Sequence, residues 1–146
     1  YIMMPYYGNK IFDVDCIAKR GKLIEVAVRE RQLKNPLMPT STGHKIKMDK
    51  RIENYVKKLC GVFKVDGPAD FDIVKDDKGK PILLDSGCRF SGSVGGSYNA
   101  GKNMLSQLLR FLLGIPFKEF KIRDGCVLRP YISMIEVPKK NEKDFL

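Results

Sequence analysis

Two aspartates, Asp72 and Asp85, lie on two short strand-like runs that a polar stretch of five residues separates. If Lys78 and Gly79 form a two-residue turn, the carboxylates face each other on one side of a hairpin, with Cβ atoms about 5 Å apart. Facing carboxylates repel, but Mg²⁺ takes oxygen ligands and is commonly held by one or two carboxylates together with nucleotide phosphates. The spacing therefore suits a metal site, but the hairpin alone favours two solvated aspartates on an open sheet face, separated by a register slip of one residue. The residues that follow the second run shift the balance towards the metal site.

An arginine and a glycine- and serine-rich segment follow the second run. Arg89 can pair bidentately with phosphate oxygens, and the glycines of residues 91–97 let backbone N–H groups approach an anion near a helix N-terminus. Both features indicate phosphate binding. Gly96 to Lys102 has the spacing of a P-loop, but Asn103 stands where that motif needs Ser or Thr, and no strand leads into the segment, so we reject a P-loop.

The elements that must position these residues begin with a predicted hairpin. Residues 10–18 and 22–30 are rich in β-branched and aromatic side chains, and Arg20-Gly21 between them suits a tight turn. Residues 32–48 contain prolines, Thr, Ser and Gly without a sustained period, which predicts a long loop, and such loops are often functional.

Two helices are predicted from the spacing of apolar residues. Asp49 can cap the first, whose inward positions would be Ile52, Val56, Leu59, Cys60 and Phe63. The second is expected over residues 103–113, stopped by Gly114 and Pro116, and should be deeply buried. Its inward positions would be Met104, Leu105, Leu108, Leu109 and Leu112.

Strands are predicted at residues 69–75 and 81–86, and a last hairpin is predicted to turn at Asp124-Gly125. Hairpins interleaved with two helices predict an α+β domain, in which two main helices flank one side of an antiparallel sheet. Residues 1–138 would form this domain, and residues 139–146 a charged tail.

Two stretches of the chain resemble a known family. They are GPADFDIVKD, residues 67–76, and KPILLDSGCRFSG, residues 80–92. Together they look like the C-terminal lobe of the ATP-grasp superfamily, and within it like the large subunit of carbamoyl-phosphate synthase. Residues 6–15 are similar to the family's hinge and the strand that follows, and residues 99–114 to its closing helix. The resemblance covers about residues 1–117.

The resemblance implies a fold, a cofactor set and site residues. The family's run is typically Leu-Leu-Glu-Ile-Asn-Pro-Arg-Phe-Ser-Gly, so Asp85 would replace the glutamate as a magnesium ligand and Arg89 would bind the phosphates. Asp72 would be the upstream metal ligand. ATP and Mg²⁺ are the implied cofactors, with Mn²⁺ as an alternative ion. The hinge backbone that would contact the adenine consists of Met3, Met4, Pro5 and Tyr6.

Further residues lie where relatives place groups that meet phosphate or the acceptor substrate. These are Arg29, Arg31, His44, Ser91 and Gly92. The alternatives are surface salt bridges for the two arginines and a loop position without a ligand for the histidine.

The chain departs from the family in ways that bear on catalysis. Gly87 stands where the family has its asparagine ligand and offers no side-chain oxygen, Asp85 is one methylene shorter than glutamate, and Met4 lies where an acidic residue often meets the nucleotide. The family's N-terminal lobes, which close over ATP, would precede Tyr1. They are therefore expected as partners of this domain within a longer parent chain.

The resulting hypothesis is the ATP- and Mg²⁺-binding lobe of a ligase that joins a carboxylate to an amine through an acyl phosphate. Its substrates would be small molecules. A catalytically degenerate lobe with a structural or regulatory role is the alternative that Gly87 favours.

Composition limits the other classes of function that this protein could have. The net charge of +10, much of it in the lysine-rich residues 45–58, leaves a basic nucleic-acid-binding domain as a second alternative, although no nucleic-acid motif is present. The four cysteines are too dispersed for a zinc site. No membrane span or signal sequence is predicted, so a cytoplasmic protein is expected.

Overall fold

The computed structural model describes residues 3, 5–8, 10–32 and 43–129. Within them a six-stranded antiparallel sheet has the order β5-β4-β1-β2-β3-β6. The strands are β1 (Phe12–Lys19), β2 (Lys22–Arg31), β3 (His44–Ile46), β4 (Gly67–Lys75), β5 (Pro81–Gly87) and β6 (Val127–Leu128). The helices are α1 (Lys50–Phe63), α2 (Gly95–Asn99) and α3 (Met104–Leu112). The predicted α+β class and antiparallel sheet are confirmed.

The β1–β2 hairpin is the centre of the sheet. Arg20 and Gly21 form its turn with φ angles of 50° and 79°, the left-handed pair that a two-residue turn between twisted strands requires. Seven of the eight residues of β1 are buried, because β2 and β4 pair with its two sides and helices or loops cover its faces. Strand β1 therefore holds all its side chains except that of Lys19 in a buried environment, polar ones included.

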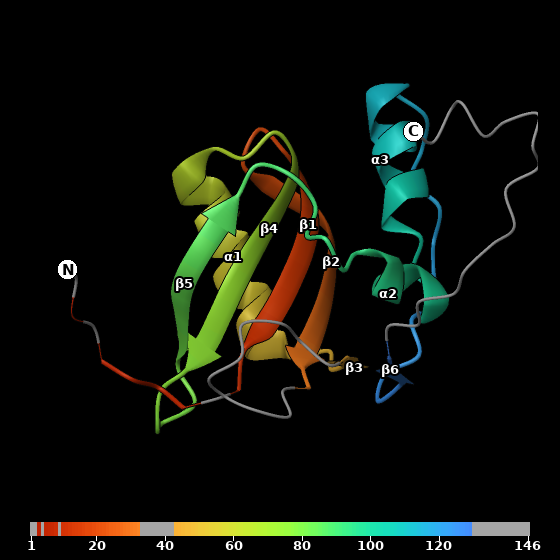
Figure 1. Cartoon of the computed structure of the whole chain (residues 1–146). Helices are drawn as coiled ribbons and strands as arrows, with labels where there is room; N and C mark the ends of the chain where they lie inside the picture. The colour runs from red at the N-terminus through yellow and green to blue at the C-terminus, as the bar shows by residue number, and fades with distance from the viewer. Residues whose placement is uncertain (1–2, 4, 9, 33–42, 130–146) are drawn as a thin grey trace, which may run out of the picture.

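Helix α1 covers one face of the sheet, behind the strands in Figure 1. The side chain of Asp49 caps it by accepting hydrogen bonds from the backbone N–H groups of Arg51 and Ile52. Four of the five predicted inward positions are buried, at Ile52, Val56, Leu59 and Cys60. The fifth, Phe63, is 52% exposed at the helix end, where its ring stacks on Phe71.

Helix α3 differs from the prediction in its orientation. Asn103 caps it as its position suggests, but Leu105, Leu109 and Leu112 are more than half exposed instead of buried. The buried face contains Met104 and Gln107, and the Gln107 amide donates to and accepts from the backbone of Lys118. Met104 packs with Ile17 and Ala27, which point away from α1, so α3 approaches the sheet from the other face rather than flanking the same side. Figure 1 shows α3 standing apart from α1, beyond β2.

Two further differences concern the short strands. Strand β3 forms inside the predicted loop 32–48 because it pairs with the end of β2, whereas residues 33–42 of that loop lie outside the described residues. The turn at Asp124-Gly125 is present, but it leads β6 onto β3 instead of closing a separate hairpin. The tail at 139–146 also lies outside the described residues.

Candidate functional site

The face of the sheet opposite α1 carries two rows of side chains across the central strands. Alternation along each strand places every second residue on this face. The register of the strands builds one row from Arg29, Asp13, Asp72 and Asp85. The next row consists of Ala27, Asp15, Asp70 and Gly87. Carboxylates from three strands therefore converge on one surface.

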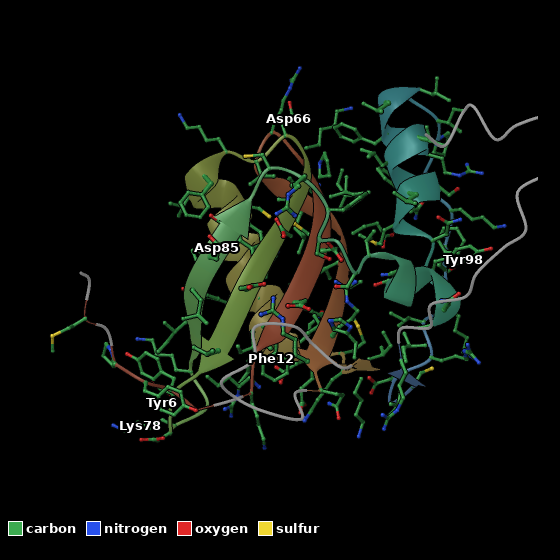
Figure 2. All side chains as sticks on the ribbon, viewed as in Figure 1. Tyr6, Phe12, Asp66, Lys78, Asp85 and Tyr98 are labelled. Carbon is green, nitrogen blue, oxygen red and sulfur yellow. The ribbon has the colours of Figure 1, made fainter. Side chains whose placement is uncertain are left out.

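Asp72 and Asp85 are register partners, although the turn that connects their strands differs from the predicted two-residue turn. The connection is the five-residue loop 76–80, closed by hydrogen bonds from Asp76 N to Lys80 O and from Gly79 N to Asp76 O. That loop alone would pair Asp72 with Leu84, but a bulge between Asp72 and Ile73 shifts the register by one residue. Asp85 is exposed on β5 (Figure 2), with its carboxylate on the open face.

Arg31 joins two of these carboxylates. Its Nη2 lies 2.6 Å from Asp13 Oδ1 and 2.7 Å from Asp72 Oδ2. On the far side of Asp13, His44 Nε2 lies 2.6 Å from Oδ2, and both of those side chains are nearly buried. A chain of paired polar side chains thus runs from His44 on β3 through Asp13 on β1 and Arg31 on β2 to Asp72 on β4.

This network gives Asp13 and Asp72 different acidities. Burial alone would raise the pKa of Asp13, but the hydrogen bond with His44 and the charge of Arg31 outweigh it and hold that pKa below its ordinary value. Burial raises the pKa of Asp72, and the negative charge of Asp13 adds to the effect against the opposing attraction of Arg31. Asp13 is therefore the more firmly ionised partner in the shared contact with Arg31.

Arg29 has a structural position that does not fit the expected contact with phosphate. It is fully buried and pairs with the equally buried Asp15 at 2.6 Å. Its guanidinium also donates hydrogen bonds to Ser91 Oγ and Ser97 Oγ, both at 2.8 Å. Ser91 in turn donates to Asp15 from its backbone N–H, at 2.7 Å, and from its hydroxyl, at 3.0 Å. These contacts anchor the glycine- and serine-rich segment to the sheet.

The anchored segment forms one wall of an open cavity of about 700 Å³. Lining side chains include the four carboxylates of Asp13, Asp70, Asp72 and Asp85, the arginines Arg31, Arg89 and Arg129, and His44. Ser91 and Gly92 also line it. Oxygen ligands for a cation and guanidinium groups for an anion thus share one cavity. Arg89 is the most accessible of the paired arginines, with a side chain 71% exposed and Nη1 3.2 Å from Asp70 Oδ2.

The predicted adenine-contacting residues lie elsewhere. Met3, Pro5 and Tyr6 are exposed and absent from the cavity lining, and Met4 lies outside the described residues. Figure 2 shows Tyr6 well apart from Asp85.

The donor set fits a hard divalent cation without forming a closed cage. Among the described residues no group of three or more His, Cys, Asp or Glu side chains is already arranged to hold a metal ion. Mg²⁺ does not require such a cage, because it is bound through one or two carboxylates and completes its shell with phosphate oxygens and water. Asp85 is exposed at the cavity, and Asp70 Oδ1 is buried without a hydrogen-bond partner among the residues that the structure describes. Both observations suit a site completed by a cation.

Sequence reasoning missed three residues of this face and one pairing. Asp13 and Asp15 on β1, Asp70 on β4, and the pairing of His44 with Asp13 were not singled out as site features. A signal was present, because two aspartates alternate with apolar residues on each of two adjacent strands that are otherwise typical of a core. Charged residues on such strands require partners.

Two lysines of the basic run at 45–58 are in ion pairs. Lys47 Nζ lies 3.1 Å from Glu30 and Lys50 Nζ lies 3.0 Å from Glu53. In the part of the chain that the structure describes, no helix has the length and apolar character needed to cross a membrane.

The fold is that of an ATP-grasp domain fragment, and comparison with known proteins identifies the family. The family described as "ATP-grasp in the biosynthetic pathway with Ter operon" matches residues 1–130, so the chain belongs to that family. None of the curated proteins matches the chain significantly.

Solved structures of several ATP-grasp enzymes share the fold at low identity. The L-amino acid ligase from Bacillus licheniformis matches with a TM-score of 0.55 and 18% identity over 72% of this chain and 29% of its own. Biotin carboxylase from Campylobacter jejuni, solved with β,γ-ATP, gives 0.61 and 14% over 80% of this chain and 29% of its own.

The biotin carboxylase domain of 2-oxoglutarate carboxylase from Hydrogenobacter thermophilus, solved with MgADP and bicarbonate, gives a TM-score of 0.59 and 13% identity. That match covers 82% of this chain and 28% of the other. The chain thus spans about a third or less of the length of these structures. At such identities the likeness shows the fold alone.

Proposed function

We propose that this chain is the C-terminal, metal- and phosphate-binding lobe of an ATP-dependent ligase that joins a carboxylate to an amine, in the manner of the carbamoyl-phosphate synthase large subunit. The observation that carries the proposal is the opposition of Asp72 and Asp85 across β4 and β5, in a cavity that also contains Arg89. Membership of an ATP-grasp family supports ATP and magnesium as the cofactors.

In the proposed site, Asp85 and Asp72 hold Mg²⁺, or Mn²⁺ in its place. The ion would supply charge neutralisation for the nucleotide phosphates. Arg89 approaches the same phosphates and stabilises the charge that develops as the terminal phosphoryl group moves to the carboxylate acceptor. Arg29, Ser91 and Gly92 form the wall that positions Arg89, and Met3, Met4, Pro5 and Tyr6 line the nucleotide only when the remaining lobes of the parent protein close over it.

The arginine contacts in the structure are compatible with this role. Arg31 and Arg89 each lie against a β4 aspartate, at Asp72 and Asp70, where a cation would otherwise bind. Arrival of a metal–nucleotide complex exchanges those pairs, because the carboxylates gain the cation and the guanidinium groups gain phosphate oxygens. The site therefore has a charge arrangement suited to both components of the complex at once.

The experiment is calorimetric titration of Mg²⁺-ADP into the full-length protein, comparing the wild type with Asp85→Ala. The matched control is Asp77→Ala, which removes an exposed carboxylate from the loop of the same hairpin outside the cavity. Asp85→Ala should weaken magnesium-dependent binding at least tenfold and Asp77→Ala should leave it unchanged. Equal binding by all three proteins would refute the assignment.

A second function, a catalytically degenerate lobe, is favoured by one specific observation. Gly87 contributes no ligand at a position where the resembled family has one. The two proposals are separated by ATP turnover with candidate carboxylates and amines: the ligase releases ADP and phosphate in a substrate-dependent way. A protein that binds Mg²⁺-ATP tightly and never turns it over would establish the degenerate lobe.

A further inference from the structure

The space beside Gly87 is already filled by another residue. Gly87 is the register partner of Asp70 across β4 and β5. A Cβ added at Gly87 would overlap Asp70 Oδ1 and would lie 3.4 Å from Asp70 Cγ. The φ angle of Gly87 is not in the left-handed region, so the backbone alone does not require glycine there. A side chain at residue 87 would therefore require the Asp70 carboxylate to move.

The Asp70 carboxylate oxygen beside Gly87 has no hydrogen-bond partner among the described residues. Its side chain is only 16% exposed, Oδ2 lies 3.2 Å from Arg89 Nη1, and Oδ1 is buried with no hydrogen bond among the described residues. A buried carboxylate oxygen left unpaired is costly, so native proteins supply it with a hydrogen bond or an ion. A cation in this cavity could be shared with Asp72 and Asp85, because these two carboxylates lie on the same face within the same pair of strands.

We propose that Asp70 is a ligand of the divalent cation, and that it provides from β4 the oxygen that residue 87 cannot provide from β5. This inference rests on the proposed function and deepens it. Asp70, Asp72 and Asp85 then form the carboxylate set, and the nucleotide phosphates complete the shell of the ion. Binding displaces Arg89 from Asp70 Oδ2, which frees the guanidinium for the phosphates.

The proposal predicts an unusual pattern in a mutant cycle. Asp70→Ala should lose the ligand, and Gly87→Asn should also weaken the site because its Cβ forces the Asp70 carboxylate aside. The double variant Asp70→Ala/Gly87→Asn removes the overlap and supplies an amide oxygen from the other strand. It should therefore bind the cation better than either single variant, which independent damage at two positions would not produce.

The measurement is Mn²⁺ binding to the full-length protein in the presence of ADP, followed by the electron paramagnetic resonance signal of free Mn²⁺. Asp70→Ala and Gly87→Asn should each lower the affinity tenfold or more, the isosteric Asp70→Asn less, and Asp77→Ala should match the wild type. The double variant should return to within about threefold of the wild type. Urea midpoints measured alongside separate lost ligands from lost folding.

The outcomes distinguish this inference from the function on which it rests. Wild-type protein that binds no Mn²⁺ with ADP would overturn both. Binding that Asp85→Ala abolishes while Asp70→Ala and Asp70→Asn keep at wild-type strength would overturn only the role of Asp70. A double variant no tighter than Asp70→Ala would overturn the exchange of ligands between the strands.

Discussion

The buried pair of Asp15 and Arg29 allows a quantitative test of how the phosphate-binding wall is held. Arg29→Met removes the guanidinium and leaves the Asp15 carboxylate with no exposed surface and no cation. Removing one partner of a buried ion pair destabilises a protein by about 3–5 kcal/mol, because the other partner remains buried as an uncompensated charge. The hydroxyls of Ser91 and Ser97 also lose a donor.

The expected effect is large against the whole stability of a domain, which is about 5–15 kcal/mol. With a urea dependence of about 2 kcal/mol/M, Arg29→Met should lower the unfolding midpoint by about 1.5–2.5 M, as followed by circular dichroism. The matched control is Lys50→Ala, whose ion pair with Glu53 involves a lysine side chain 81% exposed. Its loss should change the free energy of unfolding by less than about 0.5 kcal/mol.

The double variant Asp15→Leu/Arg29→Met tests the physical cause. It removes both charges, so the penalty for an unpaired buried carboxylate disappears. What remains lost are the hydrogen bonds that Arg29 donates to Ser91 and Ser97 and those that Ser91 donates to Asp15, at about 1 kcal/mol each. The double variant should therefore be more stable than Arg29→Met alone. The reasoning would be refuted if Asp15→Leu and Arg29→Met each lowered the free energy of unfolding by less than about 1 kcal/mol and the two losses added up in the double variant.

Two further predictions concern the α1 side of the sheet. Asp49→Ala removes both the helix cap and the partner of Lys75 and should cost about 1–2 kcal/mol. Burial would raise the pKa of Asp49, but the Lys75 contact and the two backbone donors lower it, so its contribution is fully present above the unfolded pKa. It disappears as pH falls through the lowered, folded pKa, and urea midpoints of wild type and variant should converge once the pH lies below that pKa. Cys16 and Cys60, buried with sulfurs 3.8 Å apart, should resist a thiol reagent in the native state, where burial and the neighbouring thiol raise the pKa of Cys16. Exposed Cys88 should react at once, and equally fast labelling of all three would contradict the packing.

The opposition of Asp72 and Asp85 was predictable from the sequence because alternation and hairpin pairing leave few registers. The turn itself was not, since the loop 76–80 closes through the Asp76 side chain, which accepts from the N–H groups of Lys78 and Lys80. A bulge then restores the register that the simpler turn would have given. Two local departures cancel, and no propensity rule anticipates such a cancellation.

The orientation of α3 was not predictable for a different reason. Leu105, Leu108, Leu109 and Leu112 share one face of the helix, so the apolar pattern predicted that this face turns inward, whereas in the structure Leu105, Leu109 and Leu112 are exposed. The side that turns inward carries Met104 and Gln107, and the Gln107 amide satisfies two backbone groups of Lys118 in the chain that returns beside the helix. A buried polar group with specific partners therefore lies where the apolar pattern predicted leucines.

Arg29 and Arg31 show the limit of sequence reasoning most directly. They are two residues apart on β2 and point to the same face, so alternation assigns them equal roles. The structure separates them because the segment containing Ser91 and Ser97 covers only one end of that face. Arg29 is buried beneath that segment in its ion pair with Asp15. Arg31, in contrast, lines the cavity and lies between Asp13 and Asp72. The segment that resembles a phosphate-binding loop thus also determines which arginine is available to a ligand, and only a long-range contact could carry that information.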